Sequence, residues 1–370
     1  MPFKSYVFMQ LIHISEGFRI FSRRLRLALT SPKRYNGNPE EICRQIIEDC
    51  WNKRYFQASA GHFCEFWTRD FAWCIEPLIR LGHGKRVEKT LKYALGIFSK
   101  DKIRTTISPK GKAFDFPYYA VDSVPYFVYC LRVLGDYGLI MKYKTFLNKQ
   151  IGYYNKTAVG RDGLVRRDRH FSSMKDYAKR TSSCYGNVMI AMLKDEINRI
   201  NKKHKLLDNP FTHDYRKLIK NIFWNGKYFL DDLSGRDYVA GDANIFPFLF
   251  VFNDRAMLRS SIKAIQDAGL DRPVPLKYTQ KNAKISMISL GKIVPDYEVD
   301  SVWMHMGPLY IKLVKQVDKK LAGKYIEQYD KLIMAYRNFF ELFRNNKPYS
   351  SLFYHADESM LWAAMYLDLK

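Results

Sequence analysis

The chain has 370 residues, of which 47% are apolar and 15% are aromatic. These values allow a large hydrophobic core, and they exclude a disordered, collagen-like or low-complexity protein. The 61 lysines and arginines outnumber the 37 aspartates and glutamates, and the resulting net charge of +24 favours an anionic partner such as nucleic acid, a membrane surface or an acidic substrate.

The cysteines, histidines and apolar stretches narrow the class of protein further. The six cysteines include no CxxC pair and the eight histidines lack metal-ligand spacing, so we expect reduced thiols and no metal or cofactor. The first residues, MPFKSYVFMQLIHIS, lack a cleavage site of small residues, so a secretory signal is not expected. No stretch reaches the ~18 uncharged apolar residues of a membrane span. The sequence thus predicts a cytoplasmic protein.

Residues 1–36 form a separate basic segment that ends at the Ser31–Pro32 break. It has the pattern of an amphipathic helix, in which apolar residues alternate with arginines: Phe18, Ile20, Phe21, Leu25 and Leu27 against Arg19, Arg23, Arg24 and Arg26. One interpretation is an arm that binds a membrane surface or nucleic acid. The other, which we prefer, is a helix packed on the outside of the main domain.

Residues 37–370 show the apolar periodicity of helices, separated by loops rich in Gly, Pro, Asp and Ser. Phe71, Cys74, Ile75 and Leu78, for example, follow the i, i+3, i+4, i+7 spacing of one helix face. About twelve such segments are predicted, at 40–58, 70–82, 85–100, 122–136, 139–152, 180–203, 211–223, 243–252, 255–268, 300–318, 321–343 and 356–369.

The links between these segments alternate between long and short. Within each consecutive pair the link is long, as in 101–121 and 153–179, whereas only a few residues separate one pair from the next. This pattern describes six antiparallel helical hairpins whose long loops emerge at the same end, and six such hairpins can close into a ring. We therefore expect an all-α fold with its functional residues in the loops around one mouth.

Each long loop carries an acidic residue near the start of its second helix. These residues are Asp70, Asp122, Asp176, Asp242, Asp300, and Asp357 with Glu358. Each is also a suitable helix N-cap, and we interpret Asp357 and Glu358 as the cap and first turn of the last helix. Aromatic residues accompany several of these acids, including Trp67, Trp73, Trp303 and Tyr354. Carboxylates that bind hydroxyls, beside rings that stack on C–H faces, suit a sugar.

The loop motifs resemble those of the six-hairpin glycosidases, a superfamily that includes glucoamylases, amylo-α-1,6-glucosidases, trehalases and neutral invertases. The motif FWTRDFAW (66–73) is similar to that of their first hairpin. Segments 120–138, 162–187, 223–248, 300–311 and 339–369 are similar, in the same order, to those of the other five. The resemblance covers about residues 40–370 and implies an (α/α)6 barrel. One departure is that Met304 and Met306 flank His305, where many relatives have small polar residues.

The resemblance also implies roles for individual residues. The general acid of these families lies in the third loop and the general base in the sixth, which places the acid at Asp176 and the base at Glu341. The positions that bind the sugar of the terminal subsite correspond to Trp67, Arg69, Asp70 and Asp122. We expect four more substrate-binding residues, namely Asp300, Trp303, His305 and Tyr354.

Two features of the sequence leave alternatives to this assignment. Lys175, Lys179 and Arg180 oppose a proton on Asp176 if they point inward, so Asp122 is the reserve acid. Glu341 also suits an exposed position on a helix, so Glu358 is the reserve base.

The sequence therefore predicts a single (α/α)6 barrel at residues 37–370, acting as an inverting glycoside hydrolase on an α-glucoside or related sugar. Such an enzyme needs one protonated and one ionised carboxyl, ~6.5–9.5 Å apart. The expected partner is an oligosaccharide or polysaccharide, with an anionic surface or polymer as a second partner of the positive charge. The alternatives are a barrel that binds a glycan without cleaving it, an enzyme for uronic-acid polymers and a nucleic-acid-binding protein.

Overall fold

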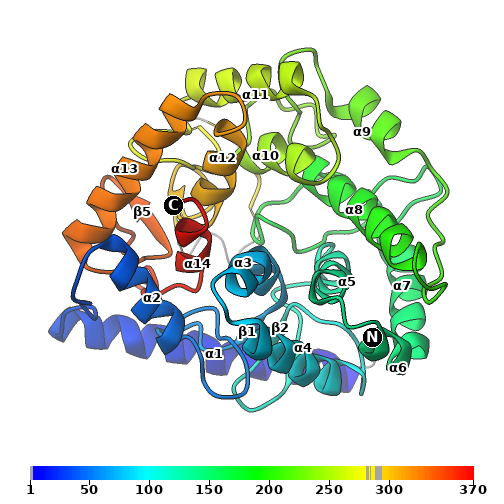
Figure 1. Ribbon diagram of the computed structural model, residues 1–370, viewed down its shortest axis with the longest axis horizontal. Helices are drawn as coiled ribbons and strands as arrows, with labels where there is room; N and C mark the ends of the chain where they lie inside the picture. The colour runs from blue at the N-terminus through cyan, green and yellow to red at the C-terminus, as the bar shows by residue number, and fades with distance from the viewer. Residues whose placement is uncertain (1–2, 281–282, 284, 288–293) are drawn as a thin grey trace.

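The computed structural model describes residues 3–280, 283, 285–287 and 294–370. Figure 1 shows an inner ring of helices around the centre of the molecule, with further helices outside it. The inner helices are α3 (Thr68–Arg80), α5 (Ser123–Leu134), α8 (Cys184–Asn201), α10 (Gly241–Phe250), α12 (Met306–Val314) and α14 (Ala363–Leu367). The outer helices are α2 (Pro39–Asp49), α4 (Gly84–Phe98), α7 (Lys144–Ala158), α9 (Tyr215–Phe223), α11 (Arg255–Asp267) and α13 (Lys319–Tyr336), and the short α6 (Tyr137–Lys142) precedes α7.

The inner helices pack on one another in chain order and close the ring. Helix α3 contacts α5, then α5 contacts α8, α8 contacts α10, α10 contacts α12, α12 contacts α14, and α14 returns to α3. Each hairpin runs from an outer helix through a long loop to an inner helix. The predicted (α/α)6 barrel is confirmed, and the twelve predicted segments correspond to its twelve helices.

Several helices are shorter than predicted, and the differences fall in the mouth loops. The segment predicted at 321–343 ends as a helix at Tyr336, where Arg337 adopts a left-handed backbone with φ of 54°. Residues 337–341 are irregular and 342–344 form a strand, so Glu341 is buried and does not lie on an exposed helix, and that interpretation was wrong. The segments predicted at 300–318 and 356–369 begin as helices only at Met306 and Ala363.

Two small antiparallel sheets connect the mouth loops of neighbouring hairpins. In the first, β1 (Phe66–Trp67), β2 (Thr106–Ile107) and β3 (Ala113–Phe114) join the first and second hairpins. In the second, β4 (Val302–Trp303), β5 (Leu342–Arg344) and β6 (Lys347–Pro348) join the fifth and sixth. Loops fixed in this way can hold side chains at defined positions above a rigid helical ring.

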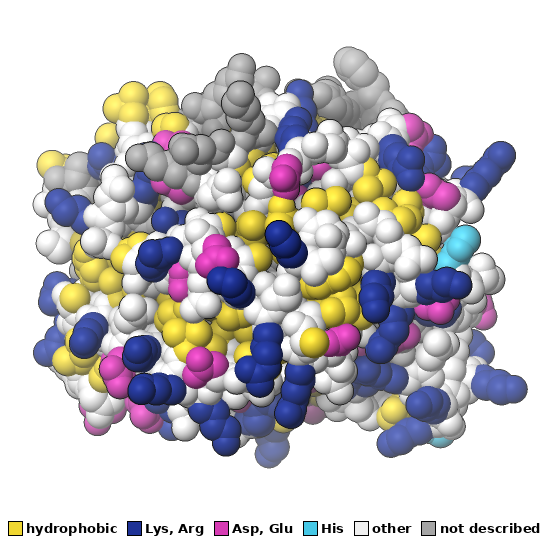
Figure 2. Space-filling model, turned by 90° about the horizontal axis from the view of Figure 1, so that it is seen from above, with side chains coloured by type: hydrophobic (Ala, Val, Ile, Leu, Met, Phe, Trp, Pro, Cys, Tyr) yellow, Lys and Arg dark blue, Asp and Glu magenta, His cyan; other side chains and the backbone are white. Residues whose placement is uncertain are grey.

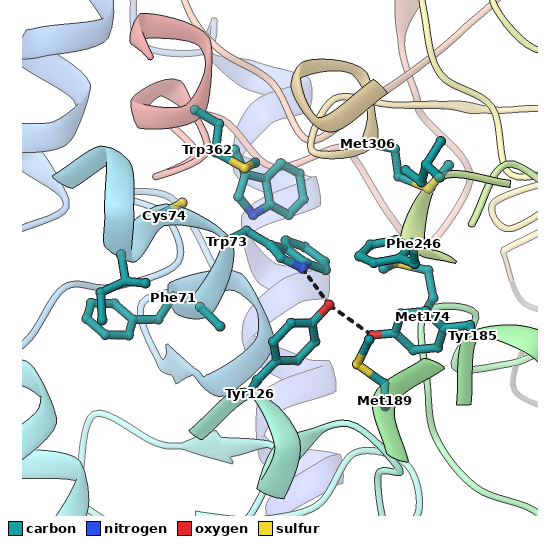
Figure 3. Packing of buried hydrophobic residues seen from close by; sticks show 14 of the residues in the cluster. Phe71, Trp73, Cys74, Tyr126, Met174, Tyr185, Met189, Phe246, Met306 and Trp362 are labelled. Carbon is teal, nitrogen blue, oxygen red and sulfur yellow. Dashed lines mark hydrogen bonds between the residues drawn. The ribbon is translucent and has the colours of Figure 1, made fainter. Parts of the chain in front are cut away.

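Aromatic side chains fill the centre of the barrel. Trp73 of α3 donates its indole N–H to the hydroxyl of Tyr126 on α5 at 2.9 Å, and Tyr185 of α8 lies 3.4 Å from the same hydroxyl. Phe246 of α10 packs edge-on against Tyr185, with ring centroids 4.9 Å apart (Figure 3). These rings fill the middle of the barrel beneath the mouth loops.

Helix α1 (Phe3–Leu29) lies outside the ring and packs on the mouth loops. His13 contacts the rings of Phe114 and Phe116 from the second hairpin, with centroids 6.0 and 5.5 Å away. At its other end, Arg24 donates a hydrogen bond to the carbonyl of Ser351 from the sixth hairpin at 3.0 Å. The helix thus runs across the mouth from the second hairpin to the sixth. Among the described residues, no helix has the length and apolar character that a bilayer-spanning segment requires.

Candidate active site

A cavity of about 160 Å³ lies at the loop end of the barrel, directly above Trp73. Its walls come from the loops of the first, second, third, fifth and sixth hairpins, and α1 contributes Glu16, Arg19 and Ile20. Both predicted catalytic residues, Asp176 and Glu341, line this cavity. They also contain six of the predicted substrate-binding residues, which are Trp67, Arg69, Asp70, Trp303, His305 and Tyr354.

Asp176 is a partly buried carboxyl in the loop of the third hairpin. Burial raises its pKa to about 6, although the Arg69 guanidinium, 3.3 Å away, acts in the opposite direction. The neighbouring cations do not bind Asp176 as the sequence suggested. Lys175 and Arg180 do point inward, but both form ion pairs with Asp231 and Asp242. The environment of Asp176 thus favours a proton that can be donated near neutral pH.

Glu341 directly precedes strand β5 and is 1% exposed. Its carboxylate accepts hydrogen bonds from the hydroxyls of Tyr297 and Tyr354, each at 2.5 Å, and from the backbone N–H of Asp357 at 3.0 Å. Burial raises the pKa of Glu341 to about 7, while these three donors act in the opposite direction. Because the donors stabilise the ionised form, the group is suited to accept a proton from water.

Asp70 lies in the first turn of α3 and also lines the cavity. It accepts a hydrogen bond from the indole N–H of Trp362 at 3.0 Å. Burial raises the pKa of Asp70 to about 7, with Arg69 acting in the opposite direction. The two neighbouring residues of one helix turn therefore present a cation and a carboxyl to a ligand, a pair that can bind adjacent sugar hydroxyls.

Asp122 does not line the cavity, contrary to the prediction that it binds the sugar. It is fully buried beneath Arg69, whose Nε donates a hydrogen bond to Asp122 Oδ2 at 2.7 Å, and the Tyr185 hydroxyl donates to the same oxygen at 2.7 Å. Although Asp122 occupies the N-cap position of α5, its side chain makes no capping hydrogen bond. Its position makes it a residue that orients Arg69, and it is not placed to act as the reserve acid.

Asp300 was predicted to bind the substrate and Glu358 to be the reserve base, but neither is positioned for that role. Neither residue lines the cavity. Asp300 lies 3.7 Å from the guanidinium of Arg344, and Glu358 pairs with Arg23 of α1 at 2.6 Å. Glu358 therefore holds α1 on the barrel and is not placed to act as a base.

Asp357 is not the cap of the last helix either, because α14 begins six residues later at Ala363. Its carboxylate accepts hydrogen bonds from the backbone N–H groups of His62 and Phe63, each at 2.9 Å, and from the Ser59 hydroxyl. A Cβ at Gly61 would lie 1.9 Å from Asp357 Oδ1, so only glycine fits this close approach. Asp357 thus ties the first loop to the sixth beside Glu341.

The acids of the mouth loops and the helix caps are different residues. The outer helices α2, α9, α11 and α13, and the short α6, begin at side-chain caps: Asn38, Asp214, Asp254, Asp318 and Asp136. The inner helix α8 is capped by Ser183, seven residues after Asp176. Where a helix has a side-chain cap, that cap is therefore not one of the loop acids. The loop acids instead form ion pairs or line the cavity.

Another carboxyl of the cavity wall, Glu298, comes from the loop of the fifth hairpin. It was not among the residues predicted from the sequence. It accepts hydrogen bonds from the backbone N–H groups of Tyr177 at 2.9 Å and Ala178 at 3.1 Å. Burial and the nearby Asp176 raise the pKa of Glu298 to about 8. Glu298 thereby holds the loop that presents Asp176.

Aromatic rings form the base of the cavity. The ring of His305 stacks on Trp73 with centroids 4.5 Å apart and an interplanar angle of 4°, and Trp362 and Trp303 pack on His305 at 4.7 and 5.3 Å. Burial keeps the pKa of His305 well below its usual value, so this imidazole is neutral and belongs to the aromatic surface. Of these rings, Trp73 and Trp362 were not among the predicted substrate-binding residues.

The side chains of the cavity walls limit the class of ligand that can bind there. Among the described residues, no group of three or more His, Cys, Asp or Glu side chains has the arrangement of a metal site. Arg19 and Arg69 both line the cavity, but each is ion-paired with carboxyls of the protein, Arg19 with Glu65 and Arg69 with Asp122. The walls thus offer carboxyls and aromatic rings, the combination expected for a neutral sugar.

Comparison with solved structures shows the same architecture in glycosidases. A rhamnosidase from Klebsiella oxytoca with rhamnose bound gives a TM-score of 0.61 at 12% identity, over 91% of this chain and 64% of the rhamnosidase. A glycosidase variant in complex with glucose gives 0.63 at 11% identity, over 96% of this chain and 97% of that one. Glucoamylase from Hormoconis resinae gives 0.58 at 10% identity, over 90% and 71%. These likenesses establish the fold of the six-hairpin glycosidases. No protein-family model and no curated protein matches the sequence.

Proposed function

We propose that this protein is a glycoside hydrolase in which Asp176 is the general acid and Glu341 the general base. The observation that carries the proposal is that these two carboxyls come from different hairpins, the third and the sixth, and line one aromatic cavity. Burial raises the pKa of each toward neutrality, to about 6 and about 7. Paired carboxyls of this kind can exchange protons with a glycosidic oxygen and with water.

The contacts of the two carboxyls suggest how the roles divide. Glu341 receives three hydrogen bonds that favour its ionised form, and this is the state in which a base removes a proton from water. Asp176 is held from behind by Glu298 through the backbone of Tyr177, which directs its carboxyl toward the cavity. Activation of water by a carboxylate across the sugar from the acid gives inversion of configuration.

The remaining walls suit a single sugar ring. The volume of about 160 Å³ is below the ~300–1,000 Å³ of typical small-molecule pockets, so it holds one ring and not a long oligosaccharide. Arg69 and Asp70 can bind its hydroxyls, and Trp73, Trp303 and Trp362 can pack on its apolar faces. We infer cleavage of a terminal α-linked hexose such as glucose, which the solved glycosidase variant also binds.

The test is a hydrolysis screen of the purified chain against maltose, trehalose, sucrose, starch fragments, an α-rhamnoside and a uronic-acid oligosaccharide. The proposal predicts release of a monosaccharide from at least one neutral α-glycoside. Asp176→Asn and Glu341→Gln should each abolish most of it, while the matched variant Asp300→Asn, at an acid outside the cavity, should retain it. Full activity of folded Asp176→Asn or Glu341→Gln would refute the assignment, and a glycan bound without turnover would favour a non-catalytic barrel.

A further inference from the structure

Helix α1 turns Arg19, Arg23 and the partly buried Ile20 toward the barrel, and a second set of apolar residues toward solvent. On the inner side, Arg19 forms an ion pair with the buried carboxylate of Glu65, and Arg23 pairs with Glu358. On the outer side, four large apolar residues are 66%, 71%, 53% and 90% exposed: Ile14, Phe18, Leu25 and Leu29. A surface helix normally buries its large apolar side chains, so four that face solvent on one helix are unusual.

The four residues form one continuous stripe, which we call the α1 stripe. Their spacings of four, seven and four residues place them on a single face of a helix with 3.6 residues per turn. The sixth hairpin extends the stripe with Leu352 and Phe353, which are 75% and 47% exposed, and the ring of Phe353 lies 6.0 Å from that of Phe21.

Exposed apolar surface is concentrated at this place in the described part of the chain. Six of its nine exposed large apolar side chains belong to α1 or to the adjoining 352–353 loop, and the other three are Tyr118, Met141 and Met334. Contiguous exposed apolar surface on a folded protein marks an interaction site, whereas single exposed residues do not. The α1 stripe therefore calls for a partner.

The charge of the protein decides between partners. A net charge of +24 repels a second copy of the same chain and attracts an anionic surface. Arg26 and Arg34 are exposed on or just after the helix, where they can contact anionic headgroups beside an inserted apolar stripe. A nucleic acid would neutralise the positive charge of the protein, but it would leave the apolar side chains of the α1 stripe exposed to water. Figure 2 shows lysines and arginines dispersed over another face among acidic side chains, a distribution that supports long-range attraction more than a local groove.

We propose that α1 is an interfacial helix that docks the protein on an anionic phospholipid bilayer. Ile14, Phe18, Leu25 and Leu29 insert at the boundary between headgroups and acyl chains, while the ion pairs on the inner side keep the helix on the barrel. Because the inner side of α1 also lines the cavity, docking turns the mouth of the site toward the membrane. The proposal rests on the exposure and charge of α1 and stands whether or not the cavity proves catalytic.

The test is cosedimentation of the full chain with vesicles of phosphatidylcholine alone and of phosphatidylcholine mixed with phosphatidylglycerol. We expect binding to the anionic vesicles, weakened by added salt, and little binding to the neutral ones. Phe18→Ser with Leu25→Ser should lower the affinity by roughly tenfold or more. The matched control, Met141→Ser with Met334→Ser, removes two exposed apolar side chains away from α1 and should bind as the wild type does.

A direct readout separates insertion from electrostatic attraction alone. A tryptophan introduced by Phe18→Trp should show a blue-shifted emission on addition of anionic vesicles, compared with the unsubstituted chain. Circular dichroism and thermal unfolding check that each variant is folded. The proposal is overturned if the anionic vesicles do not bind the wild type, or if the α1 stripe variant binds as tightly as the control. It is also overturned if light scattering shows a dimer that the Phe18 and Leu25 substitutions disperse.

Discussion

The hydroxyl of Tyr297 controls the ionisation of Glu341 in a way that can be measured. It donates a hydrogen bond to Glu341 Oε1 at 2.5 Å, and the pKa of this buried carboxyl is raised to about 7. A hydrogen bond to an ionised group contributes ~1.5–3 kcal/mol, and about 1.4 kcal/mol corresponds to a change of one in pKa. Tyr297→Phe should therefore raise the pKa of Glu341 by about 1–2, to roughly 8–9.

The consequence for activity follows from the two protonation states. The proposed mechanism needs a proton on Asp176 and none on Glu341, so it predicts a bell-shaped profile of kcat/KM against pH, with apparent limbs near pH 6 and pH 7. Raising the pKa of Glu341 lowers the fraction of enzyme in this state, and kcat/KM near pH 6.5 should fall about ten- to hundredfold. The same change moves the alkaline limb to higher pH and leaves the acid limb in place.

The assay is the pH dependence of kcat/KM with an aryl glycoside of the sugar that the screen identifies. Tyr349→Phe is the matched control, because its hydroxyl donates at 2.8 Å to the carbonyl of Pro295 and not to Glu341. We expect the control to keep the profile of the wild type. A Tyr297→Phe profile with both limbs and its maximum unchanged would refute the role of Glu341 as base.

Three further predictions concern single carboxyls. Asp176→Asn should reduce turnover by ~10²–10⁴-fold on a substrate with a poor leaving group. The loss should be far smaller on a dinitrophenyl glycoside, because its leaving group needs no proton. Equal losses on both substrates would argue against an acid role. Asp122→Asn removes the closer of the two carboxylates that pair with the buried Arg69 and leaves the longer contact to Asp176. The free energy of unfolding in urea should therefore fall by ~3–5 kcal/mol. A loss below about 1 kcal/mol would contradict a stabilising ion pair between Arg69 and Asp122. Burial raises the pKa of Asp70 to about 7 from 3.8, so the folded state holds a proton that the unfolded state releases, and this contribution to stability is lost as pH rises from about 4 to about 7. Asp70→Asn should flatten that decline in thermal unfolding scans at successive pH values, and an unchanged slope would show that Asp70 is ionised in the folded protein.

The ring of hairpins was predictable because its causes are local. The 3.6-residue periodicity of apolar side chains marks each helix, and the alternation of long and short links specifies which helices form a hairpin. Asp176 and Glu341 were placed by the order of the loop motifs, and the structure puts both in one cavity. The helix ends were less predictable, because an irregular segment at 337–341 and the start of β5 replace the expected helix at 337–343.

The contrast between Glu298 and Asp300 shows why the rest of the site was not predictable. The sequence rule selects the acid nearest the start of the helix, which is Asp300. The chain turns at Asp296, where φ is 61°, and then enters β4, so that Glu298 lines the cavity while Asp300 lies near Arg344, away from the cavity walls. Which of two acids two residues apart faces inward depends on the loops packed around them, and the local sequence carries no signal for it.

The orientation of α1 was equally beyond the sequence. The alternation of apolar residues and arginines predicts an amphipathic helix, and an isolated helix of this kind is expected to bury its apolar side. The structure instead leaves Ile14, Phe18, Leu25 and Leu29 exposed. On the inner side of the helix, Glu65 and Glu358 at the barrel mouth bind Arg19 and Arg23. These partners are 40 or more residues away in sequence, so only the fold brings them together.

The measurement that tests the central claim most directly is the anomeric configuration of the first product. The purified chain would be mixed with an α-linked substrate from the screen, and the released sugar followed by NMR before mutarotation. Paired action of Asp176 and Glu341 predicts that the β-anomer appears first and that Asp176→Asn and Glu341→Gln both suppress it. Initial release of the α-anomer, or unchanged release by either variant, would contradict the account.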